Sequence, residues 1–138
     1  MSTYYGNPLA IGAWELKIFE LASAYMHLSA WWKPAKVNPI LEIRWPDNSY
    51  IYKKKVELQQ QIIPSWVAYL LWNILSTKEN MPAWWINTFD YKWLKVATKS
   101  WTTNVKLKNG KKLPRDWWLV NYTPSKVAVY WAWNTKWE

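Results

Sequence analysis

Residues 117–137, Trp-Trp-Leu-Val-Asn-Tyr-Thr-Pro-Ser-Lys-Val-Ala-Val-Tyr-Trp-Ala-Trp-Asn-Thr-Lys-Trp, decide the fold class of this chain. The Thr123-Pro124-Ser125 segment can cap a helix that runs to Trp137. The same stretch can instead form a strand, paired with residues 117–122, because β-branched and aromatic residues favour strands. One face of that strand would consist of Val127, Val129, Trp131 and Trp133. We expect the helix over 124–137, which makes the chain mainly α; the alternative is α+β.

Helical spacing dominates the sequence upstream. Residues 8–32 repeat apolar side chains three and four positions apart, which is one face of a helix. Further helices are predicted over 53–77, where Pro64 must kink the helix or begin its second half, and over 82–101. We therefore expect one domain, residues 1–138, built as a helical bundle with short β-hairpins.

Two hairpins are predicted between these helices. In residues 39–52, apolar and polar residues alternate up to Trp45, the turn residues Pro46-Asp47-Asn48-Ser49 follow, and Tyr50-Ile51-Tyr52 returns. In residues 105–113, Asn109-Gly110 lies between alternating residues, which is a strong hairpin signal.

The residues that usually perform catalysis are scarce. The chain has no cysteine, three glycines and a single histidine, His27, on the polar strip of the first predicted helix. A lone histidine cannot form a metal cluster, and three scattered glycines cannot form a phosphate-binding loop. We expect a protein that is not an enzyme, with no catalytic residues, no metal and no cofactor.

The apolar runs are too short for a membrane helix. The run from Trp66 to Trp72, which no other run exceeds, falls well below the roughly 20 residues that a spanning helix needs. No basic segment followed by an apolar run begins the sequence, so we expect no signal peptide. The expected location is the virion if the protein is viral, and otherwise the cytoplasm.

Positive charge is concentrated in three segments. Eighteen Lys and Arg residues against nine Asp and Glu residues give a net charge of +9, which attracts polyanions. Arginine, the usual reader of guanine, occurs only twice, which favours contact with phosphates over readout of bases. A solvated lysine face is the alternative. The candidate nucleic-acid-binding residues are Arg44, Lys53, Lys54, Lys55, Lys92, Lys95, Lys99, Lys106, Lys108, Lys111, Lys112 and Arg115. Of these, Lys92, Lys95 and Lys99 are predicted to line one helix face.

Fifteen tryptophans exceed what one small core usually holds. Trp14, Trp66 and Trp93 fit the apolar faces of helices and are expected in the core. Adjacent tryptophans cannot both point inward, because neighbouring residues lie about 100° apart around a helix. We expect them to pack between protein copies, although they could also stack on bases or sugars. The candidate interface residues are Trp31, Trp32, Trp84, Trp85, Trp117, Trp118, Trp131 and Trp133.

A short segment resembles the later motifs of RecB-family nucleases, in which a strand with Glu-x-Lys precedes a helix with Gln and Tyr. The matching residues are Leu41-Glu42-Ile43-Arg44, Gln59-Gln60-Gln61 and Tyr69-Leu70-Leu71. Arg44 stands at the lysine position, so the resemblance implies an inactive metal site.

In its small size, basic charge and lack of cysteine, the chain resembles nucleocapsid proteins of filamentous viruses of hyperthermophilic archaea. That resemblance implies a helical fold and subunits that wrap double-stranded DNA. We expect a structural protein that coats nucleic acid without sequence preference and contacts other copies of itself or a related coat protein. The alternatives are a small basic inhibitor or adaptor that binds an acidic groove of a host enzyme, and a carbohydrate-binding module.

Overall fold

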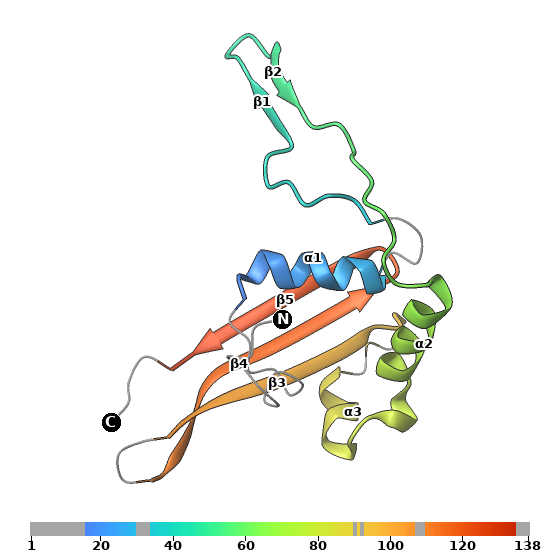
Figure 1. Cartoon of the computed structure of the whole chain (residues 1–138), viewed down its shortest axis with the longest axis vertical. Helices are drawn as coiled ribbons and strands as arrows, with labels where there is room; N and C mark the ends of the chain where they lie inside the picture. The colour runs from blue at the N-terminus through green and yellow to red at the C-terminus, as the bar shows by residue number, and fades with distance from the viewer. Residues whose placement is uncertain (1–15, 30–33, 90, 92, 107–109, 135–138) are drawn as a thin grey trace.

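The protein combines a small antiparallel sheet, helices packed around it, and a long two-stranded arm (Figure 1). The structure is a computed structural model that describes residues 16–29, 34–89, 91, 93–106 and 110–134. The fold is α+β, so the expected mainly α bundle is wrong. The reason is that the carboxyl-terminal third of the chain, with its β-branched and aromatic residues, forms the sheet instead of helices.

The main sheet has three antiparallel strands in the order β3-β4-β5. They are β3 (Ala97–Lys106), β4 (Lys112–Thr123) and β5 (Lys126–Trp133). The hairpin predicted over 105–113 is confirmed, since Val105 pairs with Leu113, and its strands continue well beyond the predicted range. Gly110 follows the first strand with a φ of 83°, a conformation that glycine adopts without strain. Asn109 lies outside the described residues.

The helix expected over 124–137 is wrong, because Lys126–Trp133 is strand β5 and pairs with β4. The hydrogen bonds of Thr123 explain why this segment resembled the start of a helix. Its hydroxyl accepts hydrogen bonds from the backbone N–H groups of Ser125, at 3.4 Å, and Lys126, at 3.1 Å. A threonine can make such bonds at a turn as well as at a helix start. Here they close the tight β4–β5 turn, and residues 135–137 lie outside the described part.

Among the described residues, three α-helices precede the sheet. Helix α1 (Ile18–Ser29) lies within the predicted 8–32, whose other parts, 8–15 and 30–32, lie outside the described residues. Helix α2 (Ser65–Ser76) begins directly after Pro64, as one form of the 53–77 prediction required. A short 3-10 turn, η2 (Lys78–Asn80), then leads to α3 (Ala83–Phe89).

Two predicted helical ranges are wrong in part. Residues 53–63 contain no helix and form the returning leg of the arm. Residues 97–101 belong to strand β3, not to a helix that starts at 82. The β-branched residues Thr98, Thr102 and Thr103 disfavour a helix and suit a pleated strand.

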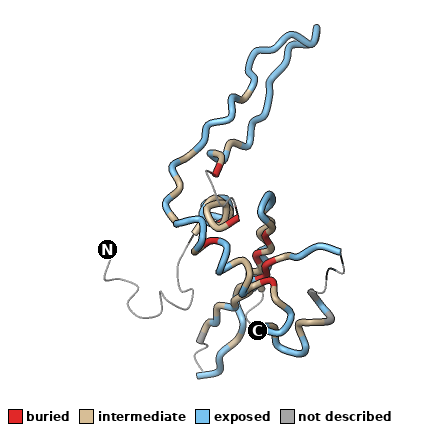
Figure 2. The backbone as a smooth tube through the Cα atoms, turned by 90° about the vertical axis from the view of Figure 1, so that its right-hand side faces the viewer, coloured by how far each residue is buried: buried red, intermediate tan, exposed pale blue. Residues whose placement is uncertain are grey.

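The core lies between α1 and one face of the sheet, with α2 beside α1 and β3. Val120 and Tyr122 of β4 are fully buried there, and the ring of Tyr25 meets Tyr122 edge to face at 5.7 Å. Ala68 is the buried contact of α2. In Figure 2 the buried positions cluster in this region, where the helices meet the sheet.

The chain between α1 and α2 leaves this body and returns as the arm, residues 34–63. Its outer part is a two-stranded sheet of β1 (Glu42–Arg44) and β2 (Tyr50–Lys53), so the hairpin predicted over 39–52 is confirmed. Figures 1 and 2 show that the arm projects from one end of the molecule and is exposed along most of its length.

Candidate nucleic-acid interface

Backbone hydrogen bonds join the two legs of the arm both at its base and in its outer part. Near the base, Lys36 N–H donates to Glu57 O and Gln59 N–H donates to Pro34 O, both at 2.8 Å. At the base itself, the amide of Gln61 donates to the carbonyl oxygen of His27 at 3.1 Å, which ties the arm to α1. The two legs are therefore joined at the base of the arm as well as through β1 and β2.

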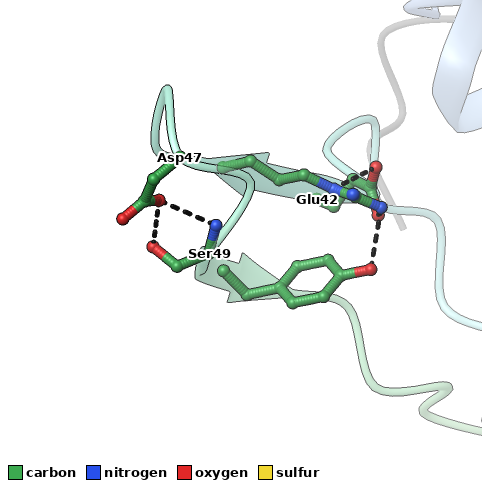
Figure 3. Close-up of polar contacts among 5 residues, drawn as sticks. Glu42, Asp47 and Ser49 are labelled. Carbon is green, nitrogen blue, oxygen red and sulfur yellow. Dashed lines mark hydrogen bonds and ion pairs between the residues drawn. The ribbon is translucent and has the colours of Figure 1, made fainter.

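The tip is a turn of five residues, 45–49, shaped by asparagine and aspartate. Asn48 has a φ of 67°, a left-handed conformation that asparagine tolerates better than most residues. Asp47 Oδ1 accepts hydrogen bonds from the Ser49 N–H at 2.9 Å and the Ser49 hydroxyl at 2.6 Å (Figure 3). These bonds lower the pKa of the Asp47 carboxyl. The side chain therefore stays ionised and continues to accept both hydrogen bonds.

The two legs bring lysines together in a groove near the middle of the arm. This lysine groove is lined by Lys36, Val37, Asn38, Tyr52, Lys53, Lys54, Lys55 and Glu57. Glu57 pairs with Lys36 at 3.2 Å, and the Asn38 amide donates to the Tyr52 hydroxyl at 2.8 Å. Four lysines against one carboxylate leave the groove positively charged. Of its cations, the sequence prediction identified Lys53, Lys54 and Lys55.

Lys36, Asn38 and Tyr52 were missed because they lie outside the three lysine segments. The signal that could have found Lys36 is the hairpin itself. Extending the register in which Glu42 pairs with Lys53 would have placed residue 36 opposite residue 59, which is close to its observed partner Glu57 and to the lysines of the returning leg.

Arg44, predicted to bind nucleic acid, is occupied by neighbours on the arm. Its guanidinium pairs with Glu42 through two contacts of 3.0 and 3.2 Å. It also donates to the Tyr50 hydroxyl at 2.8 Å and lies 4.4 Å from the centre of that ring. Glu42 therefore neutralises Arg44 locally, while Lys53, whose ammonium lies 4.9 Å from the ring centre of Tyr50, adds a positive charge on the same face.

The helix face predicted for Lys92, Lys95 and Lys99 does not exist. Lys99 lies on β3, Lys95 precedes that strand, and Lys92 lies outside the described residues. The ammonium of Lys95 donates to Asn73 Oδ1 at 2.8 Å and lies 4.8 Å from the ring centre of Trp72. That of Lys99 donates to the carbonyl oxygen of Ser100. Their binding of nucleic acid stays a prediction, but they do not act as a helical row.

The third predicted group lies at the far end of the sheet, around the β3–β4 turn. Lys111 and Lys112 are exposed there, while Lys108 and the side chain of Lys106 lie outside the described part. Arg115 Nε lies 3.6 Å from Asp116 Oδ2. The predicted cations in the described part of the chain thus fall into three separate regions, which are the arm, the start of β3 with Lys95 and Lys99, and this turn.

Four tryptophans form a stack on the sheet face that carries α1. This tryptophan ladder consists of Trp101 on β3, Trp118 on β4, and Trp131 and Trp133 on β5. Successive ring centres are 5.6, 5.7 and 4.5 Å apart, with interplanar angles of 6°, 26° and 21°. Strand pairing explains the order, since Trp101 pairs with Trp118 and Trp118 with Trp131.

Asp116 fixes one end of the ladder. Its carboxylate accepts hydrogen bonds from the indole N–H of Trp131 at 3.2 Å and from the Thr103 hydroxyl at 2.6 Å. The outer members remain accessible, with Trp131 43% and Trp133 54% exposed. Sequence reasoning placed Trp118, Trp131 and Trp133 at an interface and missed Trp101, which it assigned to a helix.

The geometry of the ladder limits what it can bind. A sugar or a base stacks on the open face of an aromatic ring. Within the ladder, Trp118 and Trp131 each have two stacked neighbours, whereas Trp101 and Trp133 end the row and each have one. The inner rings therefore have little free face for a sugar or a base. Partly exposed indoles of this kind are typical of protein interfaces, which favours the protein-contact interpretation over the carbohydrate one.

The other tryptophans give a mixed result. Trp66 is 67% exposed and Trp93 is 92% exposed, so their placement in the core is wrong. Both were assigned from helical spacing, but α2 turns Trp66 outward and Trp93 lies in no helix. Trp84 is exposed and meets Trp85 edge to face at 5.3 Å, and Trp117 is exposed on the sheet face opposite Trp118. Trp14, Trp31 and Trp32 lie outside the described residues.

Among the described residues, no group of His, Asp and Glu side chains could hold a metal ion. His27 is partly buried on α1. Within the same part of the chain, none of the helices combines the length and apolar character needed to span a membrane.

Comparison with known proteins supports the fold alone. The chain is similar to a crystal structure of PBPA from Mycobacterium tuberculosis, with a TM-score of 0.62 and 17% identity. The match covers 84% of this chain and 26% of that one, so this chain spans about a quarter of that protein's length. No protein-family model and no curated protein matches the sequence.

Proposed function

We propose that this protein is a non-enzymatic structural protein that binds the phosphate backbone of nucleic acid and assembles through aromatic contacts. The observation that supports this best is the lysine groove, in which Lys36, Lys53, Lys54 and Lys55 converge from two legs of an exposed arm. Double-stranded DNA is the proposed partner, bound without regard to sequence.

Lysine suits this task because its ammonium is a point charge that pairs with phosphate without a fixed geometry. The groove also offers the Asn38 amide and the Tyr52 hydroxyl, which are neutral groups of the kind that contact phosphate oxygens. The two arginines pair with Glu42 and Asp116 and so contribute little to readout of bases. Both features favour binding to the backbone.

Assembly is the second part of the proposal. The exposed edges of the tryptophan ladder, together with Trp84 and Trp117, offer aromatic surface of the kind enriched at protein interfaces. Weak phosphate contacts repeated over many copies along one polymer give strong total binding. The helical fold implied by the nucleocapsid resemblance is not the fold observed, so the proposal depends on the groove and the ladder and not on that resemblance.

Binding of duplex DNA as a function of salt tests the proposal. We expect the chain to bind duplexes of unrelated sequence equally, with log K falling by about 0.9 per phosphate neutralised as log salt rises. The variant Lys53→Gln/Lys54→Gln/Lys55→Gln should reduce this slope by up to about 3 units and weaken binding at least tenfold.

The matched control is Lys17→Gln/Lys78→Gln/Lys126→Gln, which removes the same charge from exposed sites on the body. If both variants lose equal affinity, binding is a general effect of net charge and the groove is not the site. If the parent chain ignores DNA at low salt but forms a one-to-one complex with an acidic protein, the inhibitor alternative replaces the proposal.

A further inference from the structure

The outer arm, residues 37–58, is a two-stranded ribbon, and in the described part of the chain no other helix or strand packs extensively against β1 or β2. Large apolar side chains along it, 39% to 72% exposed, are Val37, Ile40, Leu41, Ile43, Trp45, Ile51, Val56 and Leu58. An isolated two-stranded hairpin is marginally stable in water, and a third strand or a packed face is usually needed. The exposed apolar side chains of the ribbon therefore indicate that another protein surface packs against it.

Strand β1 offers a backbone edge for this purpose. Leu41 O accepts from Lys54 N–H at 2.8 Å and Trp45 N–H donates to Ser49 O at 2.9 Å, so odd-numbered residues direct their backbone groups toward β2. In an antiparallel ribbon these directions alternate. The N–H and C=O groups of Glu42 and Arg44 consequently point to the outer edge, where none of the described residues pairs with them.

The sequence of this edge is complementary to itself. An antiparallel copy of β1, related by a twofold axis at Ile43, places Glu42 opposite Arg44 of the copy, and Arg44 opposite its Glu42. Because Glu42 and Arg44 already pair along their own strand, the four side chains would form a square of alternating charge. In the same register the hydrogen-bonded pairs form between Glu42 and Arg44 of the two copies, whose backbone groups face outward.

We propose that two copies of this chain associate through β1, joining their arms into a four-stranded antiparallel sheet. The partner is a second copy because twofold pairing matches the edge to itself in both backbone direction and charge. Pro46 lacks an N–H group and limits the pairing to the residues around Ile43. This contact deepens the assembly part of the proposed function, but it needs neither nucleic acid nor the tryptophan ladder.

Charge exchange tests the register in solution without nucleic acid, by sedimentation over a range of concentrations. Glu42→Arg places Arg opposite Arg, and Arg44→Glu places Glu opposite Glu, so each variant alone should dimerise roughly tenfold more weakly. An equal mixture should recover the affinity of the parent chain, because each mixed pair has opposite charges. Loss of the pairing within one strand cannot explain recovery, since mixing leaves it unrepaired.

A cysteine test covers the case in which the charge variants disturb the arm. The chain has no cysteine, so Ile43→Cys introduces a single thiol. Residues opposite each other in a non-hydrogen-bonded pair have Cα atoms about 4.5 Å apart, within the range of a disulfide. Ile43→Cys should form a covalent dimer under mild oxidation, and Ile51→Cys, exposed on β2, should not. A monomeric parent chain, no recovery in the mixture, or equal cross-linking of the two cysteine variants would overturn the proposal, while DNA binding could persist.

Discussion

Asp116 accepts hydrogen bonds from the sheet residue Thr103 and from Trp131, which is a member of the tryptophan ladder. Its side chain is 18% exposed, accepts from Thr103 and Trp131, and lies beside Arg115. A partly buried carboxylate with these donors holds the Trp131 ring in a single orientation. The order of the exposed end of the ladder thus depends on one acid that is not itself aromatic.

Replacing Asp116 with Ala should lower the free energy of unfolding by about 2 kcal/mol, because Thr103 and Trp131 lose their acceptor. Urea unfolding followed by tryptophan fluorescence measures the change. Glu79→Ala, at an exposed site, should change stability by less than about 0.5 kcal/mol. Equal effects of the two substitutions would show that Asp116 does not organise the ladder.

The ionisation of Tyr122, a buried core residue, makes the stability of the fold depend on pH. Burial, and to a smaller extent the neighbouring Tyr25, raise the pKa of its hydroxyl above the ordinary value near 10. The folded protein therefore keeps the proton at a pH where the unfolded chain loses it. The stability associated with Tyr122 is complete below pH 10 and decreases as the pH rises above that value.

The variant Tyr122→Phe should flatten this decrease, and thermal unfolding between pH 8 and pH 11 is the measurement. At neutral pH it should be as stable as the parent or about 1 kcal/mol more stable, since the buried hydroxyl has no hydrogen-bond partner among the described residues. A steep decrease above pH 10 that persists in the variant would assign the pH dependence to other tyrosines.

At the scale of elements, turn residues predicted the hairpins, whereas helical spacing was right at α1 and wrong at β3, and the cap signal at Thr123 was misleading. Turn chemistry identified both hairpins, and Pro64 marked the start of α2. Helical spacing failed at β3, because pairing with β4 decides the structure of residues 97–106 and is not visible in that segment alone. At β5 the cause was different, because a threonine such as Thr123 can form its hydrogen bonds at a helix start or at a turn.

The candidate site could also be predicted only in part from the sequence. The lysine run 53–55 is visible in the sequence, but its partner Lys36 comes from the opposite leg and joins it only through the register of the ribbon. Trp101 joins the ladder for the same reason, through its pairing with Trp118. Composition identifies the kinds of residue, and strand pairing determines which of them meet.

At the scale of the whole molecule, the outer arm does not share the hydrophobic core of the body, which consists of the three helices and the three-stranded sheet. The body contains the buried core between α1, α2 and the sheet, whereas the outer arm contributes none of the fully buried apolar side chains of the described chain. Both proposed contacts of the arm, with phosphates and with a second copy, are therefore separable from folding. The body carries the tryptophan ladder and the lysines of the β3–β4 turn.

Replacing residues 37–56 with a short Gly-Ser linker tests this division. The shortened chain keeps Ala35, Leu58 and the Gln61–His27 bond, so its Tm should stay within about 5 °C of the full chain. It should lose both tight DNA binding and dimerisation through β1, whereas contacts through the ladder should remain. If the shortened chain fails to fold, the arm is part of the stability of the body. If it folds and binds DNA as before, the cations of the sheet carry the function instead.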